Sequence, residues 1–368
     1  MPKGGTIRAT GLALAIALAS STALAGPSLQ DSLMGVGINS ITEWSNCEKI
    51  AQKPLIAQDR EYHQVLWDGW DHIVIVMCAQ ELFPNDELDE ATARVKLQAY
   101  RDQIERISKI FPDSAWVIAF KGYEPVGGWS VGGVKRTQLY QRIESSSKMQ
   151  DQFVRFWRVA AEVFEGQERV AFNLMNEPEW TGFGGRSQWL ALATRAGTAI
   201  RERSPSRTLI LEGTHKSLVA RNSSTQMLKP IDLDRVIYAF HYYGSNSERW
   251  GQYPYRQPTP LDAHSARAAL ADITRFKHKY KVPTALTEIG IIAHDPGTRG
   301  GVPTPDRVTF VQDTLMPWHK TCGCGITWWA LADRNTPYTR TQDQDWPKAQ
   351  SYPRTPDEKL FEALELKR

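Results

Sequence analysis

Eight short apolar runs alternate along this chain with segments of helical periodicity. Each run is apolar on both faces, which is typical of parallel strands that are buried on both sides. The runs lie at Met34–Asn39, Ile73–Met77, Ala115–Phe120, Val170–Met175, Thr208–Glu212, Val236–His241, Thr284–Thr287 and Gly325–Trp329. Eight parallel strands that alternate with helices are what a closed barrel needs. The sequence therefore predicts an α/β fold, a single (β/α)8 TIM barrel.

The first 25 residues have the pattern of an export signal. Lys3 and Arg8 precede an apolar stretch, and Ala23-Leu24-Ala25 forms a small-residue cleavage site. The apolar stretch is too short for a stable membrane span. We expect cleavage after residue 25, a barrel domain over residues 26–368, and a secreted or periplasmic bacterial protein without membrane association.

Charge limits the class of partner. The formal net charge of the whole chain is +3, and it falls when Lys3 and Arg8 are removed with the leader. The remaining chain has no basic field of the kind that holds nucleic acid. We expect a monomer that acts on a neutral substrate.

Four cysteines follow the predicted leader. Cys47 and Cys78 come after neighbouring predicted strands and could meet on one rim, whereas Cys322 and Cys324 are close enough to pair only under strain. Export permits disulfides, but the sequence leaves their pairing open. The histidines lack the spacing that a zinc site at Cys322-x-Cys324 would need.

Glutamates stand at the C-terminal ends of two predicted strands that lie far apart in the sequence. Glu177 follows the run at Val170–Met175, and Glu288 follows the run at Thr284–Thr287. The C-terminal ends of barrel strands meet at one mouth, where the active sites of such enzymes lie. Two carboxylates there suit retaining glycoside hydrolysis, in which one protonates the leaving oxygen and the other attacks the sugar. We interpret Glu177 and Glu288 as the catalytic residues of an O-glycosyl hydrolase.

Polar and aromatic residues accompany these glutamates. Asn176 offers an amide to a sugar hydroxyl, and such hydrogen bonds tighten in the transition state. His241 and Tyr243 share one face of the sixth strand because strand side chains alternate, so both can orient the nucleophile. The last strand ends in two tryptophans, and alternation sends one indole into the mouth as a flat surface for a sugar ring.

These residues and their order resemble glycoside hydrolase family 5, the cellulase and mannanase family of (β/α)8 retaining glycosidases. The resemblance is carried by Asn176-Glu177-Pro178, His241-x-Tyr243, Glu288 and Trp329. It implies that Glu177 is the acid/base, that Glu288 is the nucleophile and that Trp329 stacks at the cleaved subsite. It implies no metal or organic cofactor.

The chain departs from the family pattern at two strands. The family's arginine on strand two is replaced by Val74, and its histidine at the end of strand three is absent from Val117–Gly122. That arginine helps to keep the nucleophile ionised by adding nearby positive charge. We expect Lys121 or Arg334 to supply this charge in a divergent member of the family.

Aromatic residues in the predicted rim loops are candidate sugar platforms. They are Trp44, Tyr123, Trp129, Trp180, Tyr242, Trp250 and Tyr253. An open row of such residues suits a polysaccharide chain and cleavage within it, although the sequence fits both an open groove and a closed pocket. With the resemblance to the cellulase and mannanase family, we expect an endo-acting enzyme on β-1,4-glucan.

Several related functions fit the same residues. They are a β-mannanase, another β-glycosidase, a transglycosylase and a catalytically weak carbohydrate-binding barrel. A metal-dependent hydrolase would need clustered histidines and aspartates, whereas His72, His215 and His241 are scattered.

Overall fold

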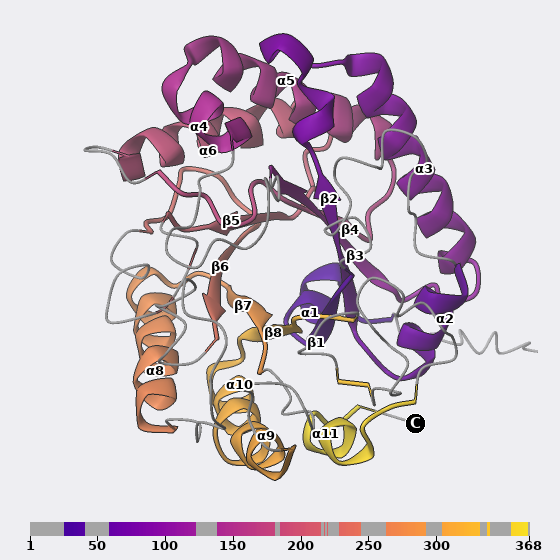
Figure 1. Ribbon diagram of the computed structural model, residues 1–368, viewed down its shortest axis with the longest axis vertical. Coiled ribbons are helices and arrows are strands. Elements are labelled where there is room, and N and C mark those ends of the chain that lie inside the picture. Colours follow the sequence, from indigo (N-terminus) through magenta and orange to yellow (C-terminus); the bar gives the residue numbers. More distant parts are fainter. Residues whose placement is uncertain are drawn as a thin grey trace, which may run out of the picture.

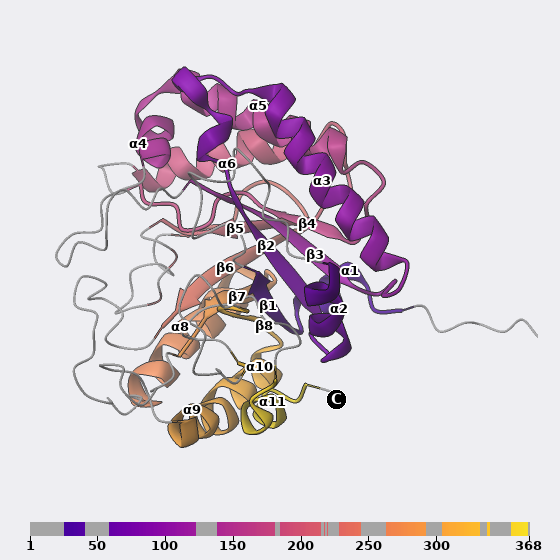
Figure 2. The same ribbon diagram turned by 45° about the vertical axis from the view of Figure 1, so that its right-hand side comes forward.

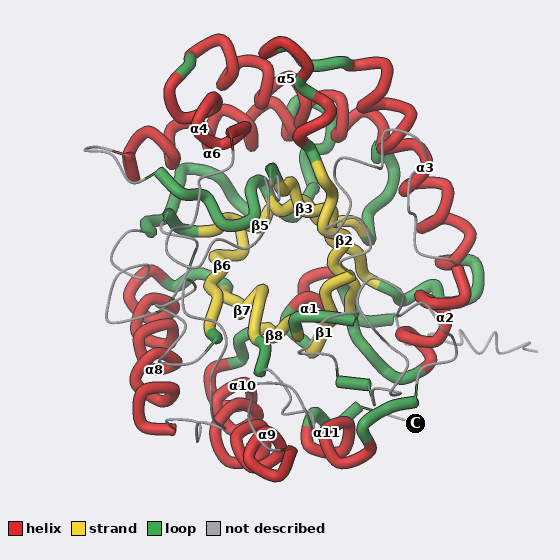
Figure 3. Tube along the Cα trace, viewed as in Figure 1, coloured by secondary structure: helices red, strands yellow, loops and turns green. Residues whose placement is uncertain are grey.

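Eight parallel strands close into a ring in the computed structural model, which confirms the predicted (β/α)8 barrel (Figure 3). The strands are β1 (Val36–Ser40), β2 (His72–Cys78), β3 (Ala115–Lys121), β4 (Val170–Asn173), β5 (Leu209–Glu212), β6 (Val236–Tyr242), β7 (Thr284–Ile289) and β8 (Gly325–Trp328). Each strand pairs with the next one in the sequence. The ring closes where β1 pairs with β8, with Gly37 opposite Thr327.

Helices surround this ring (Figures 1 and 2). The structure describes residues 26–40, 59–122, 138–180, 185–214, 217, 219, 228–243, 263–291, 304–331, 337–338 and 355–366. The helices in these ranges are α1 (Leu29–Leu33), α2 (Asp59–Trp67), η3 (Gln80–Leu82), η4 (Pro84–Asp86), α3 (Glu90–Ser108), α4 (Gln138–Ser145), α5 (Ser147–Val163), α6 (Gly185–Arg201), α8 (Ala263–Tyr280), α9 (Thr304–Phe310), the π-helical turn η6 (Val311–Leu315), α10 (Met316–Cys322) and α11 (Glu358–Ala363). None of these helices is both long and apolar enough to cross a bilayer.

Side chains of each strand alternate between the barrel interior and the helical layer. On β3, Val117 and Ala119 belong to the inner cluster, whereas Trp116, Ile118 and Phe120 pack among the residues of the outer layer. The inner cluster consists mostly of alanine and valine-sized side chains, and Leu33 from α1 joins it. The mouth can therefore hold long polar side chains above a narrow apolar interior.

The cysteines that the structure describes are bonded. Cys322 and Cys324 form a disulfide across Gly323, and Cys78 is also disulfide-bonded. Gly323 ends α10 in a left-handed conformation with φ of 59°, which glycine adopts without steric cost.

Some predictions concern positions outside the described residues. These are the leader at residues 1–25 and the roles suggested for Trp44, Cys47, Tyr123, Trp129, His215, Trp250, Tyr253 and Arg334. They stay predictions.

His72 lies inside the barrel, where both of its ring nitrogens face neutral oxygen atoms. The nitrogens are 2.9 Å from the Ser32 carbonyl oxygen and 2.8 Å from Thr327 Oγ1. Burial lowers the pKa of His72 to about 4, because a charged imidazolium is poorly solvated there. The folded protein therefore keeps this ring neutral at pH values where an unfolded chain would protonate it.

This difference predicts a pH-dependent contribution to stability. Between pH 6.5 and pH 4 the unfolded chain binds a proton that folded His72 excludes, so stability falls as pH falls. From about pH 7 to about pH 4.5 the wild type should lose about 2–3 kcal/mol of unfolding free energy relative to His72→Gln. Urea denaturation of both proteins at both pH values measures this, with exposed His278→Gln as the control. Equal pH dependence of wild type and His72→Gln would contradict it.

Candidate active site

The carboxyl ends of β4, β6 and β7 bring together three side chains that the sequence singled out. Glu177, His241 and Glu288 each place a carboxylate oxygen or ring nitrogen within 4.8 Å of the others. His241 Nδ1 is 3.3 Å from Glu177 Oε1 and 3.4 Å from Glu288 Oε2. The imidazole therefore lies between the two carboxylates and contacts both.

An irregularity in β7 aims Glu288 at this mouth. Ala285 and Thr287 line the barrel interior, so strict alternation would send Glu288 outward. The pairing of β7 with both neighbours shifts register in this region, and His241 lies opposite Glu288 just after the shift. Such bulges redirect side chains next to active sites, and here two consecutive residues face the inside.

Glu177 has an unusual backbone conformation. It follows the end of β4 with φ of 55°, in the left-handed region that costs a residue with a side chain about 1–2 kcal/mol. The main-chain N–H of Glu177 donates to Glu212 Oε2 at 2.6 Å, and Pro178 follows directly. The strand thus ends in a sharp, hydrogen-bonded turn that projects the Glu177 side chain into the mouth.

His241 is fully buried among carboxylates. Its Nε2 is 3.2 Å from Glu212 Oε2, on the side opposite Glu177 and Glu288. Burial alone would lower the pKa of His241, but the charges of Glu212 and Glu288 and the contact with Glu177 outweigh it and hold the pKa well above 6.5. Three carboxylates around one imidazole form a cluster of groups that can exchange protons, which suits acid–base chemistry.

Glu288 is the more deeply buried of the two catalytic candidates. Burial raises its pKa to about 7; the charges of Glu177 and Glu212 also raise it, whereas His241 and Lys121 lower it. Tyr243 donates its hydroxyl to Glu288 Oε2. The other oxygen, Oε1, is buried and has no hydrogen-bond partner within the described part of the chain. One oxygen is thus held in place while the other remains available.

Lys121 and Trp329 complete the mouth. Lys121 Nζ lies 3.8 Å from Glu177 Oε2 and 5.0 Å from the centre of the Trp329 ring. Trp329 belongs to the inner cluster and is followed by a cis peptide bond, whereas Trp328 packs in the outer layer. The predicted alternation of the two indoles is confirmed. Lys121 therefore lies where it could supply the expected positive charge, with its Nζ beside the Glu177 carboxylate.

Other predicted positions have different surroundings. Asn176 is buried beside Glu177, and its Nδ2 has no hydrogen-bond partner among the described residues. Trp180 is only 1% exposed, and its ring packs 5.2 Å from that of Trp189. Tyr242 is also buried, in the outer layer. The predictions that Trp180 and Tyr242 present open faces to sugar are therefore corrected: their rings pack in the core.

The sequence analysis missed two residues that bind the tip of β4. Glu212 ends β5 and is fully buried, and its Oε1 accepts a hydrogen bond from Asn173 Nδ2 at 2.6 Å. Tyr140 on α4 donates its hydroxyl to the Asn176 carbonyl at 2.5 Å. Glu212 carried the same signal as Glu177 and Glu288, an apolar run that ends in glutamate. Tyr140 had no signal of this kind in the sequence.

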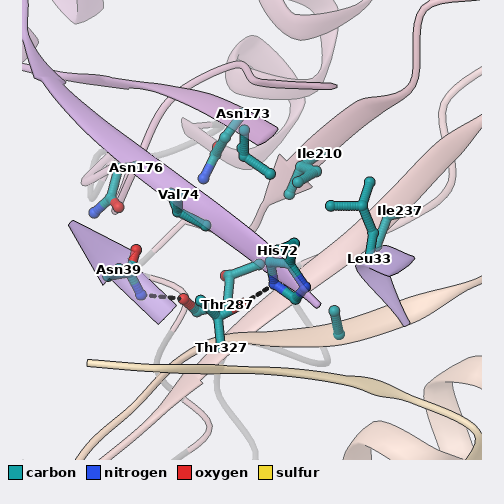
Figure 4. Close-up of a pocket in the computed structure, with 12 residues that line it drawn as sticks. Leu33, Asn39, His72, Val74, Asn173, Asn176, Ile210, Ile237, Thr287 and Thr327 are labelled. Carbon is teal, nitrogen blue, oxygen red and sulfur yellow. Dashed lines mark hydrogen bonds between the residues drawn. The ribbon is translucent and has the colours of Figure 1, made fainter. Parts of the chain in front are cut away.

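A cavity inside the barrel lies under these residues (Figure 4). Asn39 and Asn176 lie at one end of it, and Leu33 and Ile237 lie at the other. Its volume of about 10 Å³ is room for about one water molecule and too little for a sugar ring. Glu177 and Glu288 do not line it, so these two carboxylates belong to the mouth above the cavity.

Comparisons with known proteins identify the family and agree with the barrel fold. The family model for cellulase (glycosyl hydrolase family 5) matches residues 129–335, more than half of the 368-residue chain. A search of curated protein sequences gave no match. Among solved structures, an endoglucanase has a TM-score of 0.66 at 18% identity, with 92% of this chain and 99% of that chain covered.

Thermotoga maritima Cel5A is similar in two of its complexes. Its complex with mannotriose has a TM-score of 0.66 at 16% identity and covers 91% of this chain and 98% of its own. Its complex with cellobiose has a TM-score of 0.66 at 17% identity, with the same coverage of 91% and 98%. At these identities the solved structures support only the barrel fold. Membership of the family rests on the match to the family model.

The position of Lys121 predicts an effect on Glu288. Lys121→Met removes the charge and keeps most of the side-chain volume, so the pKa of Glu288 should rise above about 7. Titration of carboxyl carbon-13 signals in glutamate-labelled protein measures this, with the Glu288 signal assigned by its loss in Glu288→Gln. Lys96→Met, which removes a buried lysine that pairs with Glu81, is the matched control. A Glu288 midpoint that stays or falls in Lys121→Met would refute the predicted coupling.

Proposed function

This chain belongs to glycosyl hydrolase family 5 and is a glycosyl hydrolase, and we propose that it cleaves β-linked polysaccharide with retention of configuration. The observation that carries this proposal is the approach of Glu177 and Glu288, whose oxygens lie within 4.8 Å of each other. Retaining enzymes hold their two carboxyl groups about 5–5.5 Å apart, whereas inverting enzymes need about 6.5–9.5 Å to admit water.

In the first step Glu288 attacks the anomeric carbon and Glu177 protonates the departing oxygen. Tyr243 and His241 hold Oε2 of Glu288, which leaves Oε1 to form the bond to the sugar. Breaking the glycosidic bond places negative charge on the leaving oxygen, and the proton from Glu177 neutralises it. The products are a glycosyl ester on Glu288 and a free sugar hydroxyl.

The charge balance of the mouth suits this step. Glu177, Glu212 and Glu288 face two cations, His241 and Lys121. When His241 and Lys121 are both protonated, they contribute two positive charges. Three carboxylates that share one proton contribute two negative charges, so the cluster as a whole is neutral. That is the protonation state in which one catalytic glutamate can donate a proton while the other attacks. Lys121 thus restores the charge that the missing strand-two arginine would contribute.

In the second step water attacks the glycosyl ester, and Glu177 now removes a proton from that water. A sugar hydroxyl in place of water would give transglycosylation by the same chemistry. The two outcomes differ in what occupies the site beside Glu177 after the first product leaves.

The proposed substrate is β-1,4-glucan cut within the chain, with β-mannan as the second candidate. Trp329 lies in the inner cluster at the base of the mouth, where it is 4% exposed. The Nδ2 of Asn176, which has no partner within the described ranges, is suited to a sugar hydroxyl. The similar Cel5A structures hold cellobiose in one case and mannotriose in another, which supports testing both polymers. We further propose that the enzyme works as an exported monomer, in the periplasm or the medium.

A polymer panel tests the proposed activity. The protein should release reducing sugar from β-glucan or β-mannan, and Glu177→Ala should reduce the rate by about 10²–10⁴-fold because general acid catalysis is lost. Glu288→Ala should show no turnover, while Glu202→Ala on the exposed surface just after α6 should match wild type. Retained polymer binding without release by the wild type would instead indicate a carbohydrate-binding barrel.

Azide assigns the two carboxylates and the stereochemistry. Azide should rescue Glu177→Ala on an activated aryl glycoside and yield the β-glycosyl azide, because the ester on Glu288 still forms and is opened by the anion. With Glu288→Ala, azide should attack directly and yield the α-glycosyl azide. Proton NMR of the products distinguishes the anomers. Exchange of the two products between the variants would reverse the proposed roles.

A further inference from the structure

The peptide group between Asn176 and Glu177 is bound on both sides by buried side chains. Its N–H donates to Glu212 Oε2 at 2.6 Å, and its carbonyl accepts from the Tyr140 hydroxyl at 2.5 Å. Glu212 is fully buried at the end of β5, and Tyr140 on α4 is 3% exposed. Two elements outside β4 thus fix one peptide plane at the point where the chain turns into the left-handed residue Glu177.

Glu212 also contacts the neighbour of the Glu177 side chain. Its Oε2 lies 3.2 Å from His241 Nε2, and His241 Nδ1 lies 3.3 Å from Glu177 Oε1. Its other oxygen, Oε1, accepts from Asn173 Nδ2 within β4. The Glu212 carboxylate therefore contacts three groups: the backbone N–H of Glu177, the Asn173 side chain of β4, and the His241 ring, which lies beside the Glu177 carboxylate. These contacts join Glu212 to both the backbone and the side chain of Glu177. The same His241 Nδ1 is also 3.4 Å from Glu288 Oε2, whereas the Tyr140 hydroxyl contacts the Asn176–Glu177 peptide directly.

We propose that Glu212 and Tyr140 are positioning residues for the general acid, which hold the Asn176–Glu177 peptide plane and thereby aim the Glu177 carboxyl at the leaving oxygen. This inference rests on the proposed function. Neither side chain needs to touch substrate for this role. Both act through the Asn176–Glu177 peptide, and Glu212 acts in addition through His241.

A positioning role of this kind has a signature that general structural damage lacks. An aryl glycoside with a 2,4-dinitrophenyl leaving group departs as a stable anion and needs no proton, whereas an unsubstituted phenyl glycoside needs the acid. Misplacing the acid should therefore slow the phenyl substrate selectively. Damage to the fold, to Glu288 or to sugar binding should slow both substrates together.

The experiment compares kcat/KM on phenyl and 2,4-dinitrophenyl β-cellobioside, since this parameter reports the step in which the leaving group departs. Tyr140→Phe removes one hydroxyl and no charge, and Glu212→Gln keeps an oxygen acceptor but removes the charge. In each variant the kcat/KM for the phenyl substrate should fall by a factor at least about 10-fold larger than the factor by which the kcat/KM for the dinitrophenyl substrate falls, as expected for a displaced catalytic group. Glu212→Ala, which removes the acceptor as well, should show a larger difference than Glu212→Gln.

Matched controls use buried residues of the same types outside the mouth. Glu61→Gln on α2 and Tyr100→Phe on α3 should leave the ratio of the two kcat/KM values at that of wild type. Thermal unfolding of each variant checks the fold, and if a Glu212 variant does not fold, Tyr140→Phe decides. Equal losses on both substrates in Tyr140→Phe would overturn the inference.

The same assay separates this inference from the proposed function. If the wild type cleaves both glycosides and the variants lose equally on both, only the positioning role fails. If the wild type and Glu177→Ala both fail on these glycosides and on the polymer panel, the glycosidase proposal fails and this inference fails with it.

Discussion

The mouth of this barrel depends on the electrostatic interaction between the His241 ring and the three carboxylates around it. Three carboxylates from β4, β5 and β7 converge on one buried ring, and like charges this close repel strongly where water is excluded. A protonated imidazole between them turns that repulsion into attraction on two sides. The order of the strands makes this possible, because β6 lies between β5 and β7 in the ring. Lys121 from β3 adds the second positive charge beside Glu177.

Much of this arrangement could be predicted from the sequence, and the reason is geometric. In a closed parallel barrel every strand ends at the same mouth, so residues at strand ends meet whatever their separation in the chain. The glutamates after β4 and in β7, together with His241 and Tyr243, met as expected. The alternation of Trp328 and Trp329 was equally predictable, since adjacent strand residues face opposite layers.

Other features needed the structure because they depend on local departures from those rules. Strict alternation would have turned Glu288 outward, and only the register shift in β7 brings it inside. Trp180 follows the same strand end as Glu177, but its ring packs against Trp189, a contact between segments that no periodicity indicates. Glu212 was missed because a pair of carboxylates already explained the chemistry, although its sequence context matched theirs.

Closure of the ring has a consequence for how the chain reaches this state. The contact between β1 and β8 joins segments near opposite ends of the chain, and such non-local pairing slows folding because a long loop must be closed first. Until β8 has docked, the partly folded sheet carries two unpaired edges, each able to pair with another molecule. Pairing with β8 thus covers the exposed edge of β1. Until β8 has been synthesised and has docked, the partly folded barrel remains prone to aggregation.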